Sequence, residues 1–281
     1  MAGVRIVTDS SCDLTQQEAD DLGVAVVPLS IRFGSDEYTD RRDLSVSEFY
    51  KKMAASEALP ETAAPSPGAF EEAFRQQADA GAGGIVCVTI SSELSGTLQS
   101  AQAAAKSVSS DLPVRVVDSR SITSGLGTQV ILAARAAADG ADVDAVSAVL
   151  DDAIARTRVF GVLNTLDNLK KGGRIGGAKA LMGSILAIKP IVDISTGAVE
   201  EAGKARTRRK AFQWMRDRIL QDGAVEHLAV MDGEAADVQE LLDLLAGDFP
   251  AGSIRTGRIG PVIGTHGGPA VVGATWLAPA R

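Results

Sequence analysis

The first half of the chain alternates short apolar runs with amphipathic helical patterns, and this alternation constrains the fold more than any other feature. The apolar runs that predict strands lie at residues 4–8, 25–29, 85–90 and 114–117. Capping boxes at Thr15 with Glu18 and at Ser45 with Glu48 mark two helix starts. Strands that alternate with helices form a mainly parallel sheet covered on both faces. The sequence therefore predicts a three-layer α/β/α domain over residues 1–157, with an excursion at about residues 30–60.

The second half, residues 158–281, mixes hairpin patterns with helical ones. Apolar segments at 188–194 and 198–205 flank Ser195-Thr196-Gly197, a combination that predicts a β-hairpin. Helical patterns near 207–221 and 235–246 then alternate with strand patterns at 227–231, 253–259 and 270–276. This mixture predicts an α+β domain with a mixed sheet, and we place the domain boundary near Thr157.

The composition excludes several classes of protein. The 281 residues include two histidines, His227 and His266, and two cysteines, Cys12 and Cys87. These are too few for an all-cysteine or three-histidine zinc site, and they do not suggest a disulfide framework. A net charge of −8 argues against a nucleic-acid partner. Because no apolar run has membrane-spanning length and no signal-peptide pattern opens the sequence, we expect a cytoplasmic protein without metal or cofactor, with at most transient membrane contact.

Three of the predicted strands end in hydroxyl-rich segments. These segments are residues 9–11, 91–97 and 118–124. In an open parallel sheet, ligands bind beyond the carboxyl ends of the strands. Ser95-Gly96-Thr97 also begins a helix, where free N–H groups favour an anionic oxygen. The alternative is that Ser95 only caps this helix, which is the usual role of a serine before a helical pattern.

The enzyme motifs are incomplete. No serine has glycines at both −2 and +2, so the nucleophile elbow of α/β-hydrolases is absent. Gly172 and Gly177 have the P-loop spacing, but Ala178 stands at the lysine position. His266 is expected in a glycine-rich loop between two strands. There a neutral imidazole either donates a hydrogen bond to a ligand oxygen, acts as an acid or base, or only forms hydrogen bonds with the local backbone.

Two basic segments remain. In Lys170-Lys171-Gly172-Gly173-Arg174-Ile175, the paired glycines predict a tight turn that projects the Arg174 guanidinium, a group suited to carboxylate or phosphate. The plainer interpretation is a helix that stops after Lys171. The second segment comprises Lys204, Arg206, Arg208, Arg209 and Lys210. It is either a docking surface or a solvated helix face.

Taken in order, the motifs resemble those of the DegV family, bacterial fatty-acid-binding proteins that serve as lipid-carrying subunits of fatty acid kinase. The segments that carry the resemblance span essentially the whole chain and are Val7-Thr8-Asp9-Ser10, Thr62-Ala63-Ala64-Pro65-Ser66, residues 90–97, Val117-Asp118-Ser119, residues 170–175 and Thr265-His266-Gly267-Gly268-Pro269. The resemblance implies a non-catalytic protein that encloses one long-chain fatty acid between two domains. A separate ATP-binding kinase subunit would convert the bound carboxylate to an acyl phosphate for phospholipid metabolism.

The same resemblance implies roles for individual residues. Thr62, Ser95 with the adjoining Gly96, and His266 match the positions that bind the carboxylate, and Arg174 matches the arginine associated with the kinase. The chain departs from the family pattern at Ala63 and Ala64, where Ser-Gln is common, at Gly176, where serine is common, and at Ala270, where glycine is usual. These departures leave the head-group positions intact and bear on the finer shape of the pocket.

The energetics of a bound lipid agree with this picture. About 15 methylenes at roughly 0.8 kcal/mol each give some 12 kcal/mol of transfer free energy, as an upper bound. This is comparable to an association cost of about 4–15 kcal/mol, so the tail can hold the lipid while neutral donors bind the head group. Two alternatives remain open: a stand-alone enzyme that uses His266 on a small phosphorylated metabolite, and a lipid-sensing regulatory module.

Overall fold

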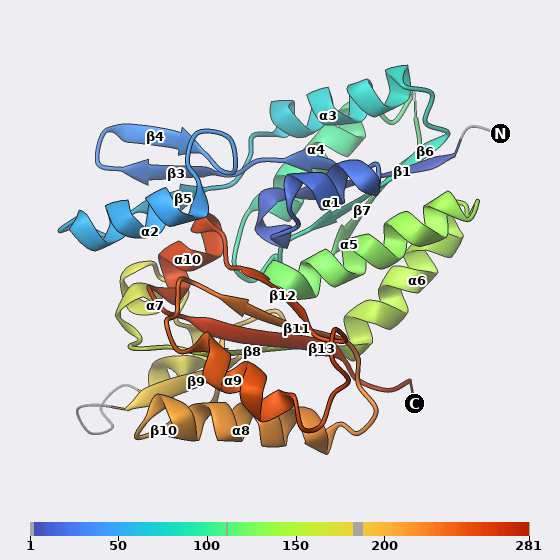
Figure 1. Cartoon of the computed structure of the whole chain (residues 1–281). Coiled ribbons are helices and arrows are strands. Elements are labelled where there is room, and N and C mark those ends of the chain that lie inside the picture. The colour runs from blue at the N-terminus through green and yellow to red at the C-terminus, as the bar shows by residue number, and fades with distance from the viewer. Residues whose placement is uncertain (1–2, 111, 182–187, 281) are drawn as a thin grey trace. The chain divides into compact units, whose positions relative to one another are not determined.

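The computed structural model describes residues 3–110, 112–181 and 188–280, shown in Figure 1. The chain forms two compact units. Unit 1 contains the residues up to Ser30 together with Thr62–Ala155, and unit 2 contains Ile31–Glu61 together with the residues from Arg156 onward. The polypeptide therefore passes between the units three times.

Unit 1 is built on a four-stranded parallel sheet with the order β2-β1-β6-β7. Its strands are β1 (Val4–Asp9), β2 (Ala25–Val27), β6 (Gly84–Thr89) and β7 (Val114–Asp118). The register pairs Val7 with Ala25 and with Cys87, and Cys87 with Val116. Since all four strands are parallel, their carboxyl ends lie along one edge, as the sequence predicts.

Helices cover both faces of this sheet (Figure 1). On one face, α3 (Pro67–Asp79) and α4 (Thr97–Ser107) bury Phe70, Phe74 and Ala101 against Ile85 and Cys87. The other helical elements of the unit are η1 (Ser10–Cys12), α1 (Gln16–Asp21), α5 (Thr123–Ala138), which contacts β1, and α6 (Val143–Arg156). The predicted three-layer α/β/α arrangement is confirmed.

Local signals in the sequence correctly place the starts of α1 and α3. Thr15 and Glu18 form the predicted capping box before α1, in which each side chain accepts a hydrogen bond from the other residue's backbone N–H. Ser66 caps α3 by accepting from the Ala69 N–H at 3.2 Å, and Pro67 occupies the first helical position. Each of these caps satisfies a backbone donor that the first helical turn leaves without an intrahelical partner.

Unit 2 contains a six-stranded mixed sheet with the order β10-β9-β8-β13-β11-β12. Its strands are β8 (Thr157–Val162), β9 (Lys189–Asp193), β10 (Glu200–Ala205), β11 (Glu226–Asp232), β12 (Arg255–Arg258) and β13 (Val272–Leu277). β11 and β12 pair in parallel, and the other neighbours pair antiparallel. The predicted hairpin is formed by β9 and β10, with Gly197 at a φ of 94° in its turn. The predicted mixed sheet is therefore confirmed.

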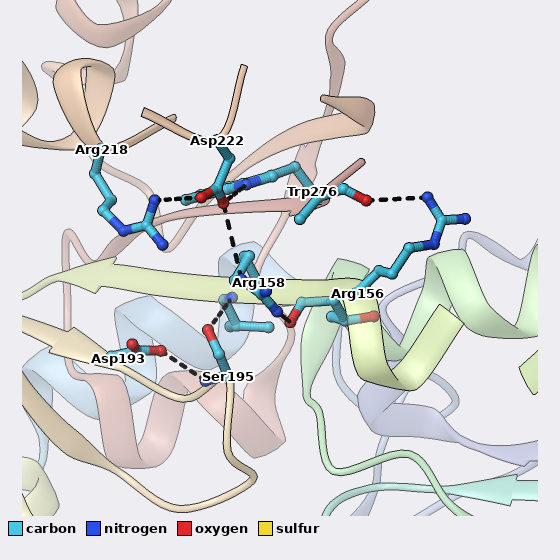
Figure 2. A network of polar contacts seen from close by, with 10 residues as sticks. Arg156, Arg158, Asp193, Ser195, Arg218, Asp222 and Trp276 are labelled. Carbon is cyan, nitrogen blue, oxygen red and sulfur yellow. Dashed lines mark hydrogen bonds and ion pairs between the residues drawn. The ribbon is translucent and has the colours of Figure 1, made fainter. Parts of the chain in front are cut away.

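Two helices, α8 (Arg208–Gln221) and α9 (Val238–Leu245), cover one face of the mixed sheet and bury Phe212, Met215 and Leu241. Figure 2 shows how Asp222, at the end of α8, is joined to the strands. Its carboxylate accepts from Trp276 Nε1 at 2.8 Å and from Arg218 Nη1 at 2.9 Å, and it forms an ion pair with Arg158 at 3.8 Å. These contacts attach the C-terminal end of α8 to β8 and β13.

Residues 31–61, expected as an excursion from the N-terminal domain, belong to unit 2 in the structure. They contain most of a small sheet with the order β4-β3-β5, and the helix α2. These elements are β3 (Ser30–Phe33), β4 (Asp36–Thr39), α2 (Val46–Ala55) and β5 (Glu61–Ala63). The segment joins unit 2 because α2 packs against α10 (Pro261–Gly267) and the Tyr50 hydroxyl donates to the Ile259 carbonyl at 3.1 Å.

No helix in the described part of the chain is both long enough and apolar enough to cross a membrane.

Candidate functional site

The hydroxyl-rich strand ends of unit 1 are tied together by two carboxylates. The fully buried Asp9 accepts from the N–H groups of Ile90 at 2.7 Å and Ser11 at 3.0 Å. Burial raises the pKa of Asp9, and the hydrogen bonds from Ser11 and Ile90 oppose this rise. Asp118, at the end of β7, accepts from the Ser92 N–H at 3.2 Å and from the Ser92 hydroxyl. Several of these polar side chains therefore hold neighbouring strand ends in place.

Ser95 does not cap α4. The N-cap is Gly96, which supplies no side-chain hydrogen bond, and the Ser95 hydroxyl is instead hydrogen-bonded to the Thr97 hydroxyl at 2.9 Å. The capping interpretation of Ser95 is therefore wrong. Because no side chain caps the first turn, the N-terminus of this eleven-residue helix keeps the N–H groups and the positive dipole end that suit an anionic oxygen.

Thr62 lies half-buried on β5, in the short segment where the chain returns to unit 1. Pro65, Ser66 and Pro67 follow and lead directly into α3. The fixed φ of proline and the Ser66 cap restrict the backbone after Thr62. Thr62 and Ser95 thus come from separate segments of unit 1, each of which leads into a helix.

His266 lies in the last turn of α10, not in a loop. The loop prediction is wrong because glycines at 260, 264, 267 and 268 weaken the helical pattern. The short helix forms because Pro261 occupies its first turn and the Thr265 hydroxyl donates to the Pro261 carbonyl at 2.9 Å. Gly268, with a φ of 78°, closes the helix by donating its N–H to the Gly264 carbonyl at 2.8 Å.

The His266 imidazole is neutral at physiological pH. Burial, with a smaller contribution from the Arg174 charge, lowers the pKa of His266 from 6.5 to about 4. A neutral imidazole carries one N–H donor and one acceptor nitrogen. His266 is therefore suited to hydrogen bonding with a ligand oxygen.

The Gly-Gly-Arg segment lies next to this imidazole within unit 2. α7 (Asp167–Lys171) ends at Lys171 with Gly172 as its C-cap, so the predicted helix stop is confirmed. Gly173 follows at a φ of 71°, and the exposed Arg174 donates from Nη1 to the Gly172 carbonyl at 2.8 Å. The helix stop leaves Arg174 exposed, and its role toward a partner stays a prediction.

Sequence reasoning missed two contacts around His266, one made by Gly172 and one made by Asn168. A Cβ added at Gly172 would clash with Nδ1 of His266 and lie 2.9 Å from its Cε1. The Asn168 amide donates to the Thr265 carbonyl at 2.9 Å. No local pattern reveals either contact, because the partners lie far apart in the sequence.

The basic stretch is divided between structural and exposed side chains. Arg208 is held by Asp237, with Nη2 2.8 Å from Oδ1, so this arginine fixes α8 to the start of α9. Lys204, Arg206, Arg209 and Lys210 are exposed. Among the residues that the structure describes, no group of three histidine, cysteine, aspartate or glutamate side chains is arranged to hold a metal ion.

Comparison with known proteins places the whole chain in one family. A family model described as "Uncharacterised protein, DegV family" matches residues 3–278. A DegV domain-containing protein of Halalkalibacterium halodurans is 34% identical over 284 residues, covering 98% of this chain and 99% of that protein.

Two solved structures show the same fold. A DegV family protein from Thermus thermophilus, described by its fatty acid binding, is 32% identical with a TM-score of 0.89, covering 99% of this chain and 100% of that chain. A stearic acid-binding protein from Eubacterium ventriosum is 28% identical with a TM-score of 0.89, covering 99% and 98%. From the family match and the identity across nearly all of its length, this chain belongs to the DegV family.

Proposed function

We propose that this protein binds one long-chain fatty acid and does not itself catalyse a reaction. The observation that carries the proposal is its similarity, over nearly the whole chain, to solved structures described as fatty-acid-binding. The aliphatic composition is compatible with this role, since aromatic residues are only 4% of the sequence. A flexible acyl tail then supplies most of the binding free energy by leaving water.

The proposed head-group residues are Thr62, Ser95 and Gly96 in unit 1 and His266 in unit 2. The uncapped N-terminus of α4 and the Ser95 hydroxyl support the assignment because both favour a carboxylate oxygen. The neutral His266 adds a further donor without a fixed positive charge. A carboxylate held by such neutral donors keeps more nucleophilic character than one held in a tight salt bridge.

The electrostatics of His266 favour a binding role over acid–base catalysis by a stand-alone enzyme. An efficient general acid or base has a pKa near the working pH. With a pKa of about 4, His266 stays unprotonated near pH 7 and is a weak base there. In this neutral state the imidazole still donates one hydrogen bond to an anionic carboxylate through its N–H group.

The proposal extends to a kinase partner in the cytoplasm. A separate ATP-binding subunit would transfer the terminal phosphoryl group of ATP to a carboxylate oxygen, giving ADP and an acyl phosphate. Arg174 is the proposed contact with this subunit, and its exposed guanidinium after the end of α7 is compatible with docking an acidic or phosphate-bearing surface.

The binding proposal is tested by purifying the protein gently, extracting it with organic solvent and identifying the extract by mass spectrometry. We expect one long-chain fatty acid per protein. A protein that carries no lipid and also takes up no added stearate would refute the proposal. Turnover of a phosphorylated metabolite without any partner, abolished in His266→Ala, would instead support the stand-alone enzyme.

A further inference from the structure

The last turn of α10 is held by two other elements of unit 2, α2 and α7. On the α2 side, the Tyr50 ring lies so close to Gly264 that a Cβ there would be 2.9 Å from Cζ. The Phe49 ring lies on the same side, with Cε1 3.0 Å from that Cβ position. The helix that carries His266 therefore packs closely against α2.

On the α7 side, the imidazole itself is in contact with Gly172. A Cβ at Gly172 would lie 2.9 Å from Cε1 of His266 and 3.1 Å from the Asn168 carbonyl oxygen, and would clash with Nδ1. Gly172 has a φ of −76°, which any residue can adopt. The need for glycine here therefore comes from the space that the imidazole occupies and not from the backbone conformation.

Asn168, one turn earlier in the chain, lies against the backbone next to His266. Its amide donates to the carbonyl of Thr265, the residue before the histidine, at 2.9 Å. Its carboxamide also lies 3.2 Å from the position of a Cβ on Gly268, two residues after the histidine. One side chain of α7 therefore bonds to the backbone just before His266 and occupies the space beside Gly268 just after it.

We infer that Asn168 and Gly172 are positioning residues that set the place of the His266 imidazole. The importance of this for the ligand rests on the function proposed above, in which His266 binds the fatty-acid carboxylate. The glycine pair before Arg174 then has a role besides projecting the guanidinium. Its first member makes room for the head-group imidazole, so the Arg174 segment and the His266 turn form one local structure.

The test compares four variants of the full-length chain. Gly172→Ala places a methyl group against the imidazole, and Asn168→Leu keeps the approximate volume of the side chain but removes the donor. Gly247→Ala is the matched control for the first, because no heavy atom lies within 4 Å of its Cβ position. Asn164→Leu is the control for the second. It removes an amide that donates to the Pro269 carbonyl at 3.2 Å and accepts from Lys189 and Arg208 at 3.3 Å, contacts that do not involve residues 265–268.

The primary measurement is the titration midpoint of the His266 imidazole by NMR. The chain has only two histidines, so His266→Gln identifies the signal, and the exposed His227 serves as internal reference. Arg174 is a charged group that lowers the pKa of His266, and the α2 side chains nearest the Gly264 Cβ position are the rings of Phe49 and Tyr50. A readout of this kind separates positioning of the imidazole from a general loss of stability.

We expect the midpoint to rise from about 4 toward 6.5 in Gly172→Ala and Asn168→Leu, because a displaced imidazole is less buried. It should stay near 4 in both controls. Retention of carboxyl-labelled stearate should fall about tenfold in the two positioning variants, the loss expected for one hydrogen bond to a charged group.

An unchanged midpoint in both positioning variants would overturn the inference, whatever happens to stearate. A raised midpoint with normal stearate retention would support the positioning role and contradict the head-group role of His266. Failure of the wild-type protein to retain stearate would contradict the proposed function alone, since the NMR titration needs no ligand.

Discussion

The half-buried, neutral His266 makes folding stability depend on pH in a calculable way. The pKa of His266 is about 4 in the folded protein, against the ordinary histidine value of 6.5 that applies to the unfolded chain. Between these values the unfolded state binds more protons than the folded state, so stability falls as the pH falls. The contribution is complete above pH 6.5 and is lost progressively as the pH falls toward 4.

The magnitude follows from the two pKa values. At about pH 5 the unfolded histidine is almost fully protonated and the folded one is mostly neutral, which costs about 2 kcal/mol of the free energy of unfolding. The full shift of roughly 2.5 pKa units corresponds to about 3 kcal/mol at lower pH. Both figures are of the same order as the effect of a typical destabilising substitution.

The assay is urea unfolding of the wild-type protein and His266→Gln at about pH 7.5 and about pH 5. Glutamine does not titrate, so the stability of the variant relative to wild type should improve by about 2 kcal/mol at the lower pH. Asp9, whose raised pKa acts in the opposite direction, is present in both proteins and cancels in the difference. A stability difference that is the same at both pH values would refute the burial argument for His266.

Three further predictions concern single residues. Ser95→Ala should weaken fatty-acid retention about tenfold in a lipid-exchange assay, because one donor to the carboxylate is lost; normal retention would remove Ser95 from the head-group site. Arg174→Ala should retain lipid but reduce acyl-phosphate formation with the kinase subunit, and unchanged turnover would contradict its docking role. Asp222→Ala should lower the free energy of unfolding by about 1–3 kcal/mol in urea, because Arg158 and Arg218 lose their shared carboxylate. Burial raises the pKa of Asp222, but the hydrogen bonds from Arg218 and Trp276 and the nearby arginine charges lower it overall. The stability difference between wild type and Asp222→Ala should therefore shrink as the pH falls below about 3.8. A stability difference that does not change with pH would count against the ion pairs.

The features that could be predicted from the sequence are those encoded within a few neighbouring residues. The capping box at Thr15, the Ser66 cap and the hairpin turn at Gly197 all involve groups close together along the chain. The strand–helix alternation likewise predicts a parallel sheet, because a helix that crosses from the end of one strand to the start of the next joins parallel strands. From that sheet follows the common edge where the hydroxyl-rich strand ends lie.

For the candidate site, the sequence supplied the residue types but not all of their roles. It left open whether Ser95 caps α4, and the structure shows that Gly96 takes the cap position instead. It placed His266 in a loop, because the glycines around this residue hide a short helix whose ends are closed by Pro261 and Gly268. Propensity is a weak signal for one or two helical turns, and tertiary packing overrides it.

The sequence by itself determined the two fold classes, most strand and helix positions and the candidate side chains. Only the tertiary structure decided that residues 31–61 join unit 2 and that Gly172 lies against His266. The physical reason is that hydrophobic periodicity and capping motifs depend only on neighbouring residues in the same turn or strand. Close packing instead depends on the shape of a partner brought in from a distant part of the chain.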